Sequence, residues 1–290
     1  MCIAQDTRRN HLIEEVKALG EKADGCAKAA IDEYLGTLED GAANKIATDK
    51  LVKALTDCGC AEGKEILKKK DMLAKKSVWA FGGDGWAYDI GFGGLDHAIA
   101  SGKDINILVF DTEVYSNTGG QSSKSTPTGA VAQFAAAGKE VKKKDLAGIA
   151  MSYGYVYVAQ IAMGADYNQT LKALHEAESY NGPSLVIAYA PCINHGIKGG
   201  LVNAQSEIKK AVEADYWHNF RFDPRLAAEG KNPFQLDSKA PTGDYVSFIK
   251  NEVRYSSLER SFPERAADLF EKADENAKSK YAALVERAQG

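Results

Sequence analysis

The sequence lacks the marks of several classes of protein. No stretch of its 290 residues approaches the roughly 18 uninterrupted apolar residues that a membrane-spanning helix needs. Residues 1–9 do not show the basic-then-apolar order of a secretory signal. We therefore expect a cytoplasmic protein with no membrane partner. A location in an organelle stays open, because an address preceding Met1 would leave no trace in this sequence.

A strong charge and a regular set of cysteines are also missing. The chain has 36 basic and 40 acidic residues and a formal net charge of −4, which argues against nucleic acid as a partner. Its five cysteines are odd in number and irregularly spaced, so we expect no disulfide framework. Cys58 and Cys60 flank a single glycine. We interpret them as solvated thiols, with a metal clip as the alternative.

Three regions differ in their residue pattern. Residues 1–75 carry apolar side chains at helical spacing, interrupted near Gly25 and Gly41, and are predicted to form several short amphipathic helices. Residues 76–200 are predicted to form the core of the fold. Residues 201–290 form an extension, with a helix near 205–214, an irregular tract that contains three prolines, and a long closing helix. Ser261, Pro263 and Glu264 predict a capping box at the start of that last helix.

Apolar β-prone runs alternate with helical segments in the middle region. The runs cover residues 77–81, 105–110, 155–159 and 184–189, and the helical segments cover roughly 86–101, 144–153 and 166–180. Such alternation is typical of a parallel sheet covered by helices on both faces. The predicted fold class is therefore α/β, with a mostly parallel sheet and helical segments at both ends of the chain.

A Gly-Asp-Gly turn follows the first of these runs, at Gly83, Asp84 and Gly85. Ligands of open parallel sheets bind at the carboxyl ends of strands, where a helix N-terminus offers N–H groups to a phosphate and glycine permits close approach. An aspartate in that turn would repel a bare phosphate, so it indicates a bridging divalent cation, and we expect Mg²⁺.

A second polar loop follows the next run, at residues 111–121. Its Thr112 hydroxyl, Val114 carbonyl and Asn117 amide are hard oxygen donors suited to Mg²⁺, and two loops after consecutive parallel strands can converge on one ion. A dinucleotide site is the alternative for the glycine turn. It fits poorly. The Gly-x-Gly-x-x-Gly/Ala pattern of dinucleotide sites, started at Gly83, needs glycine or alanine at position 88, which is Tyr88. Started at Gly91, the pattern needs one at position 96, which is Asp96.

Together the two loops resemble the diphosphate–magnesium motif of thiamine-diphosphate enzymes, in which about 26 residues separate Gly-Asp-Gly from the polar loop. The string from Trp86 to Gly129 is similar to the C-terminal thiamine-diphosphate-binding domain of pyruvate:ferredoxin (flavodoxin) oxidoreductase in particular. The resemblance continues through residues 153–159, 177–189 and 223–238. It covers about 190 residues, from Lys76 to Pro263.

This resemblance implies a function for each matching residue. Asp84 and Thr112 would be side-chain ligands of Mg²⁺, and Val114 would contribute its carbonyl oxygen. Gly83, Gly85 and Ser116 would line the diphosphate of the cofactor. Trp86 would shield the cofactor, with a simple wedge between helix and sheet as the alternative.

Two further residues acquire expected functions in the same way. Asn117 would face the thiazolium ring and the substrate as a catalytic residue. Cys192 follows the last predicted strand and matches the distal thiolate ligand of the [4Fe–4S] cluster nearest the cofactor. The implied reaction is the oxidative decarboxylation of pyruvate to acetyl-CoA and CO₂, with coenzyme A as second substrate and with ferredoxin or flavodoxin as electron acceptor.

The departures from the family limit what one chain is expected to do. The pyrimidine-binding domain with its activating glutamate is not in this sequence, and Cys2, Cys26, Cys58 and Cys60 do not reproduce the Cys-x-x-Cys spacing of the other cluster ligands. We therefore expect the chain to be inactive without pyrimidine-binding and iron–sulfur domains or subunits. The complete enzyme is expected to be a homo-oligomer, in the cytoplasm or in an organelle such as the hydrogenosome.

Several alternatives stay open at this point. The chain can be a fragment or a separate subunit, a part of another 2-oxoacid:ferredoxin oxidoreductase, or a non-catalytic thiamine-diphosphate-binding or scaffold module. Lys142, Lys143 and Lys144 are predicted to be a solvated helix start, with a docking patch for an acidic ferredoxin as the alternative. His97 and His175 are predicted to be packing or surface residues, and His195 is unassigned.

Overall fold

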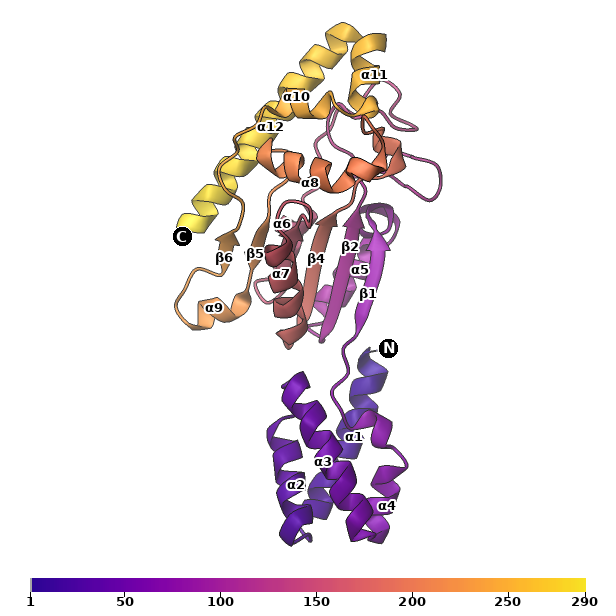
Figure 1. Cartoon of the computed structure of the whole chain (residues 1–290), viewed down its shortest axis with the longest axis vertical. Helices are drawn as coiled ribbons and strands as arrows, with labels where there is room; N and C mark the ends of the chain where they lie inside the picture. Colours follow the sequence, from indigo (N-terminus) through magenta and orange to yellow (C-terminus); the bar gives the residue numbers. More distant parts are fainter. Residues whose placement is uncertain (1) are drawn as a thin grey trace. The chain divides into compact units, whose positions relative to one another are not determined.

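The computed structural model describes residues 2–290, which divide into two compact units (Figure 1). The first unit ends at Val78 and also includes Lys103–Ile105, and the second comprises Trp79–Gly102 and Asn106–Gly290. The functional boundaries expected at residues 75 and 200 stay predictions. Within residues 2–290, no helix is both long enough and apolar enough to cross a membrane.

The first unit is helical, as predicted. Its elements are α1 (Cys2–Gly20), α2 (Gly25–Gly36), α3 (Gly41–Cys58), α4 (Ala61–Leu67) and the 3₁₀ helix η1 (Lys70–Met72). Asp40 caps α3, because its carboxylate accepts a hydrogen bond from the Ala43 N–H at 2.9 Å. Gly59 ends the helix in the left-handed conformation, at φ 64°, which glycine adopts without steric cost.

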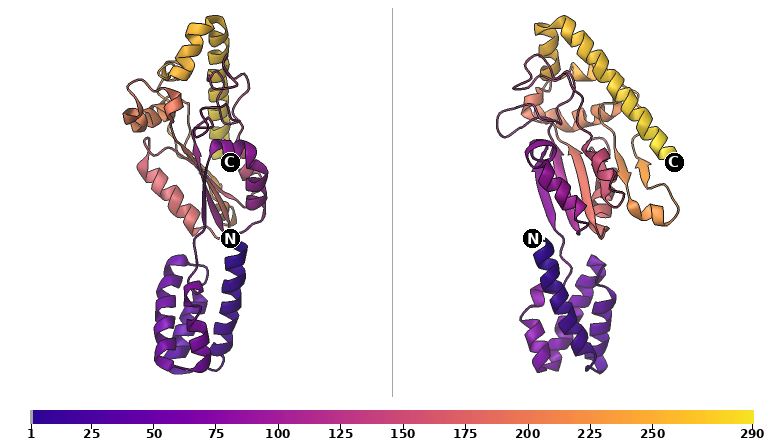
Figure 2. Two further views of the ribbon diagram at one scale, coloured as in Figure 1. Left: turned by 90° about the vertical axis from the view of Figure 1, so that its right-hand side faces the viewer. Right: turned by 180° about the vertical axis from the view of Figure 1, so that it is seen from behind.

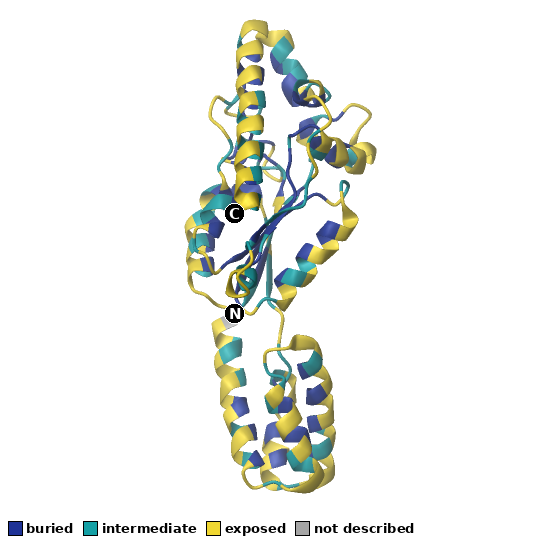
Figure 3. Ribbon diagram, turned by 90° about the vertical axis from the view of Figure 1, so that its left-hand side faces the viewer, coloured by how far each residue is buried: buried dark blue, intermediate teal, exposed yellow. Residues whose placement is uncertain are grey.

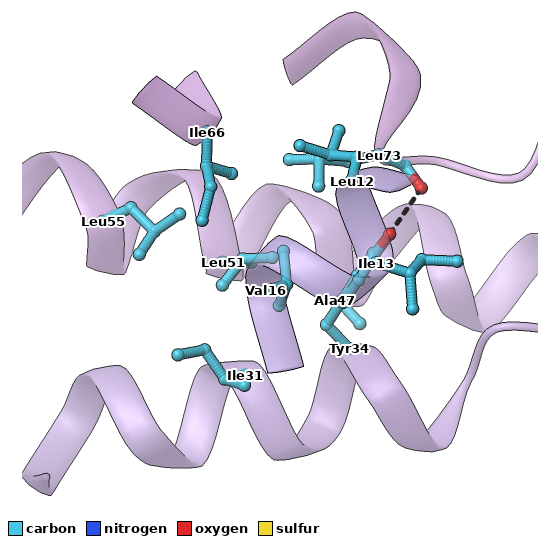
Figure 4. Packing of buried hydrophobic residues seen from close by; sticks show 10 residues of the cluster. All are labelled: Leu12, Ile13, Val16, Ile31, Tyr34, Ala47, Leu51, Leu55, Ile66 and Leu73. Carbon is cyan, nitrogen blue, oxygen red and sulfur yellow. Dashed lines mark hydrogen bonds between the residues drawn. The ribbon is translucent and has the colours of Figure 1, made fainter. Parts of the chain in front are cut away.

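The core of the first unit consists of apolar side chains from every one of these α-helices (Figure 4). Its buried members are Leu12, Ile13, Val16, Ile31, Tyr34, Ala47, Leu51, Leu55, Ile66 and Leu73. The Tyr34 hydroxyl donates a hydrogen bond to the Leu73 carbonyl at 2.9 Å, so the one polar atom in this cluster is satisfied.

The second unit contains a six-stranded sheet in the order β1-β2-β4-β3-β5-β6. The strands are β1 (Trp79–Gly83), β2 (Ile105–Asp111), β3 (Tyr157–Ile161), β4 (Pro183–Tyr189), β5 (Phe220–Phe222) and β6 (Phe234–Leu236). β1 pairs with β2 and β3 with β4 in parallel, whereas β5 and β6 are antiparallel additions. The predicted α/β class with a mostly parallel sheet is confirmed.

Helices cover both faces of this sheet. Figure 2 shows α7 (Tyr167–Ser179) on one face and α5 (Phe92–Ala100) on the other, and Figure 3 shows the buried strands between them. The short helix α6 (Leu146–Met151) precedes β3, and its N-cap Asp145 accepts a hydrogen bond from the Gly148 N–H at 3.0 Å. The buried strands thus stand between two helical layers.

The chain after β4 is mainly helical. It contains η3 (Ile193–His195), η4 (Leu201–Asn203), α8 (Ala204–Glu213), α9 (Pro224–Ala228), α10 (Tyr245–Ile249), α11 (Val253–Ser261) and α12 (Pro263–Gln289). Phe270 and Leu284 are buried on α12, while Figure 3 shows the opposite side of this helix exposed. This region also contributes to the sheet, because β5 and β6 belong to it.

Two predictions about this region are wrong. The tract between α8 and α12 is not irregular, because β5, α9 and β6 lie within it. The sequence did not reveal the two strands, since three residues are too few to give a clear alternating pattern. Ser261 does not cap α12. It is the last residue of α11, and Phe262 separates the two helices without a side-chain cap. Pro263 does occupy the first turn of α12.

Arg221 on β5 joins the antiparallel strands to α7. Its guanidinium contacts Glu176 at 2.8 Å and Asp237 at 2.8 Å, and the residue is only 6% exposed. We expect Arg221→Met to lower the free energy of unfolding by about 3–5 kcal/mol, because two largely buried carboxylates would lose their cation. Urea unfolding measures this change. Lys231→Met, which breaks an exposed pair with Glu229, should change it by less than about 0.5 kcal/mol.

Candidate cofactor and metal site

The two polar loops leave the sheet side by side. β1 and β2 are parallel and in a register that pairs Gly83 with Phe110, so Asp84 and Asp111 follow at neighbouring strand ends. Between β1 and α5 lies the π-helix η2 (Gly85–Ile90), in which the Gly91 N–H donates to the Trp86 carbonyl at 2.8 Å. π-Helical turns recur at functional sites.

Four oxygen atoms from these loops meet around Thr112. The Thr112 Oγ1 lies 2.8 Å from Asp84 Oδ1, 3.0 Å from the Val114 carbonyl oxygen and 2.6 Å from Ser116 Oγ. We call these four atoms the oxygen cluster. The structure thus brings together four of the residues that the sequence singled out for Mg²⁺ and diphosphate binding; their binding of either stays a prediction.

The oxygen cluster has more acceptors than protons. Ser116 donates its hydroxyl proton to Thr112, and the single Thr112 proton can satisfy either Asp84 or the Val114 carbonyl, but not both at once. A cation would satisfy all of them together. A carboxylate, a hydroxyl and a carbonyl are hard oxygen ligands, and one carboxylate is the number that Mg²⁺ commonly takes when phosphate and water complete its shell.

Asp84 is the charged member of the oxygen cluster and is 1% exposed. Burial and then the nearby charge of Asp111 raise the pKa of Asp84 to about 6, although hydrogen bonds from Ser123 and Thr112 act in the opposite direction. The Ser123 hydroxyl donates to Asp84 Oδ2 at 2.5 Å. A carboxylate that is buried without a bonded cation is costly, and a bound divalent ion would remove that cost.

Glycines allow the aromatic residues of the site to pack against the backbone. A Cβ on Gly85 would lie 2.5 Å from the ring of Tyr115, so the second loop rests directly on the Gly-Asp-Gly turn. The Trp86 ring lies against Gly82 and Gly91, where added Cβ atoms would come within 2.2 Å of it. Trp86 therefore packs within its own turn. At Gly83, an added Cβ would meet no atom closer than 3.9 Å.

Asn117 makes no hydrogen bond to the oxygen cluster in the described part of the chain. It is exposed in the turn after Ser116, and within residues 2–290 its side chain makes no hydrogen bond. The next residues are fixed, since the Gly120 N–H donates to the Tyr115 carbonyl at 2.9 Å. An exposed amide on a fixed turn is available to a ligand, and the catalytic function of Asn117 stays a prediction.

Cys192 lies in the loop after β4 and is partly exposed. Its sulfur accepts hydrogen bonds from the Asn194 backbone N–H and the Asn194 side-chain amide, both at 3.5 Å. The loop is attached to the second polar loop, because the Ala190 N–H donates to the Asp111 carbonyl at 3.0 Å. Cluster binding by Cys192 stays a prediction.

The other cysteines that the structure describes belong to the first unit. Cys26 and Cys58 are exposed, and Cys60 is partly exposed. The side chain of Cys2 lies outside the described part of the chain. Among the described residues, no three side chains of histidine, cysteine, aspartate or glutamate are grouped to hold a metal ion.

Lys143 corrects one expectation from the sequence. Residues 142–144 are not a helix start, because α6 begins at Leu146. Lys143 Nζ lies 2.8 Å from Asp111 Oδ2 and 2.9 Å from Glu113 Oε1. Two buried carboxylates at the end of β2 require a cation there, and the run of three lysines did not reveal which member supplies it.

Sequence reasoning also missed His195, which is fully buried. Its Nε2 lies 2.9 Å from the Thr112 carbonyl oxygen. Since a carbonyl only accepts hydrogen bonds, Nε2 carries the proton and donates it. The position of His195 three residues after Cys192 places it on the loop that reaches Thr112, but its partner is 83 residues away in the sequence. His97 and His175 are exposed on α5 and α7.

Known proteins resemble this chain over different lengths. Residues 59–188 match the family described as thiamine pyrophosphate enzyme, C-terminal TPP binding domain. The whole chain is 52% identical to pyruvate:ferredoxin oxidoreductase of Moorella thermoacetica and covers 25% of that protein. Over 97% of its length it is 52% identical to pyruvate-flavodoxin oxidoreductase of Enterobacter agglomerans, of which it covers 24%.

A third relative carries a different name. Over 71% of its length the chain is 54% identical to a mitochondrial pyruvate dehydrogenase (NADP+) of Euglena gracilis, of which it covers 11%. The chain thus spans about a quarter of the length of the first two relatives and less of the third.

Proposed function

Because this chain belongs to the pyruvate:ferredoxin and pyruvate-flavodoxin oxidoreductase family as a thiamine-diphosphate-binding domain, we propose that its oxygen cluster holds the Mg²⁺ that anchors the cofactor diphosphate. Asp84 and Thr112 supply side-chain ligands, and Val114 supplies its carbonyl. Gly83, Gly85, Trp86 and Ser116 border the diphosphate. The observation that carries this proposal is the meeting of Asp84, Thr112, Val114 and Ser116 within hydrogen-bonding distance at two neighbouring strand ends.

The complete enzyme would oxidise pyruvate to acetyl-CoA and CO₂. Bound thiamine diphosphate supplies the carbanion-stabilising chemistry of that reaction. The chain supplies position: the oxygen cluster fixes the diphosphate, a group remote from the reacting carbon, so binding energy is used for orientation. Asn117, exposed on its fixed turn, faces the substrate side, and the remaining domains supply the pyrimidine site.

Cys192 would serve electron transfer in the complete enzyme. Its sulfur already accepts two N–H donors from Asn194, as a thiolate ligand of a [4Fe–4S] cluster commonly does. The other ligands of that cluster would come from the rest of the enzyme, and ferredoxin or flavodoxin would accept the electrons. NADP⁺ is a second candidate for the final acceptor, because one relative is named for it.

Calorimetric titration of the chain with thiamine diphosphate tests the proposed function. With Mg²⁺ present we expect saturable binding, and without a divalent ion we expect that heat to disappear. Adding the missing domains of the enzyme should tighten binding and give CO₂ and acetyl-CoA from pyruvate and coenzyme A. Binding that is equally strong with and without a divalent ion would contradict the proposed use of the oxygen cluster.

A further inference from the structure

Glu113 lies between the two predicted metal ligands of the second loop and has an unusual backbone. Its φ is 59°, in the left-handed region, although it is not a glycine. A residue of this kind is held there by its surroundings, and such residues gather at functional sites. The left-handed turn at Glu113 brings the Val114 carbonyl back to within 3.0 Å of the Thr112 hydroxyl.

The surroundings of the Glu113 side chain explain how this conformation is kept. The residue is 1% exposed, and its Oε1 accepts a hydrogen bond from Lys143 Nζ at 2.9 Å. Its Oε2 accepts from Arg254 Nη2 at 2.7 Å and from the Tyr216 hydroxyl at 2.5 Å. Its backbone carbonyl accepts from the Thr126 hydroxyl. Every oxygen of Glu113 therefore has a donor.

Hydrogen bonds to the side chain and to the backbone hold Arg254 in place. Its Nε donates to Glu252 Oε2 at 2.6 Å, and its backbone carbonyl accepts from the Val131 N–H at 2.9 Å. The same Glu252 faces His195, whose other ring nitrogen carries the contact to the Thr112 carbonyl. Thr112 and Glu113 are thus both connected to the segment around Arg254.

Two of these donors, Tyr216 and Arg254, come from outside the segment that matches the family of TPP-binding domains, whereas Lys143 and Thr126 lie within it. The matching segment ends at residue 188, whereas Tyr216 follows α8 and Arg254 lies on α11. None of the predicted magnesium ligands lies beyond residue 188. No site residue expected from the sequence lies between Tyr216 and Arg254.

We infer that Glu113 and Arg254 are positioning residues of the metal site: the C-terminal region of the second unit holds the loop from Thr112 to Val114 in the strained conformation that directs the Thr112 hydroxyl and the Val114 carbonyl at one ion. This inference rests on the proposed function. It states in addition that the ligand residues alone are insufficient, because the chain beyond residue 188 sets their geometry.

Glycine and alanine at position 113 separate positioning from ordinary packing. Both Glu113→Gly and Glu113→Ala remove the carboxylate and leave the same donors unpaired. Only alanine keeps the steric cost of a left-handed backbone. If Glu113 acts by holding that backbone, Glu113→Ala weakens ion binding about tenfold more than Glu113→Gly. If Glu113 only fills space, the smaller glycine is the more damaging substitution.

The experiment uses the full chain with saturating thiamine diphosphate and Mn²⁺ as the ion, followed by electron paramagnetic resonance. We expect binding to weaken from wild type to Glu113→Gly to Glu113→Ala, and Arg254→Met to weaken it as well. Arg221→Met is the matched control, because it also removes a buried arginine paired with two carboxylates of the second unit. Its Mn²⁺ affinity should equal that of wild type.

A ligand-free measurement keeps the outcomes distinct. Amide hydrogen exchange at Tyr115 and Gly120, which bond to Gln121 and Tyr115 carbonyls, should speed up more in Glu113→Ala than in Glu113→Gly. Equal exchange and equal Mn²⁺ affinity in both variants would overturn the inference. A wild-type chain that binds no Mn²⁺ would contradict the proposed function instead, and the exchange rates would still decide whether Glu113 holds the loop.

Discussion

Asp84→Asn is expected to reduce the affinity of the chain for Mg²⁺ and thiamine diphosphate by about 100-fold or more. The substitution keeps the size of the side chain and removes the only charged ligand of the oxygen cluster. Loss of a group that only orients a metal ligand typically lowers metal affinity by about 10–100-fold. Loss of a charged ligand should lower the affinity at least as much. Calorimetric titration at pH 7 measures the change.

The fold itself should tolerate this substitution. In the ion-free chain the folded Asp84 keeps its proton up to about pH 6, while the unfolded residue loses it near 3.8. The folded state then binds more protons in this window, so the Asp84 contribution to stability falls as the pH rises from about 4 to about 6. The free energy of unfolding of Asp84→Asn should not show this decline with pH. A large loss of stability at pH 7 would mean that Asp84 supports the fold rather than an ion.

Asp96→Asn provides the matched control. Asp96 lies on α5 in the same unit, and its carboxylate accepts a hydrogen bond from the Tyr153 hydroxyl at 2.8 Å. It is not part of the oxygen cluster. Its replacement should leave the affinity for Mg²⁺ and thiamine diphosphate unchanged, and an equal loss in both variants would contradict a specific function of Asp84.

Gly85→Ala is expected to have the second large effect, a roughly 10–100-fold loss of cofactor affinity. The added Cβ would lie 2.5 Å from two atoms of the Tyr115 ring and 3.0 Å from Cγ, which is close to the backbone, so a simple rotation of the ring cannot relieve the overlap. Overpacking of this kind typically costs about 1–3 kcal/mol. Here it would push apart the two loops that form the oxygen cluster.

A second substitution tests that explanation. Tyr115→Ala removes the ring that the new methyl group meets, so the double variant Gly85→Ala/Tyr115→Ala should bind the cofactor more tightly than Gly85→Ala alone. Affinities of the two single variants and the double variant, measured under the same conditions, give the coupling between the positions. Additive losses would show that Gly85 acts without contact with Tyr115.

The sequence predicted those parts of the fold that depend on local pattern. Continuous apolar runs identified β1 to β4, and the residues after β1 and β2 had to share one edge of the sheet because parallel strands end on the same side. Asp84 and Thr112 could therefore be proposed as neighbours. The π-helical turn after Asp84 could not, since it departs from the regular spacing on which such predictions rest.

Partners that lie far apart in the sequence were beyond this kind of reasoning. Glu113 is a polar residue in a polar loop, and nothing in its neighbours indicates the left-handed backbone. Its donor Arg254 is 141 residues away. Lys143 likewise resembles its two neighbouring lysines, although only its amine reaches both Asp111 and Glu113. Burial selects among chemically equivalent residues, and burial is decided by the whole fold.

The distance along the chain between Glu113 and Arg254 has a consequence for biosynthesis. A ribosome makes Asp84 and Thr112 long before Arg254, and domains form from the N-terminal side as the chain emerges. Closing so long a loop costs entropy, which only the finished second unit repays. A nascent chain that ends before Arg254 would therefore carry every predicted magnesium ligand without the means to orient them, and cofactor loading would wait until translation has passed α11.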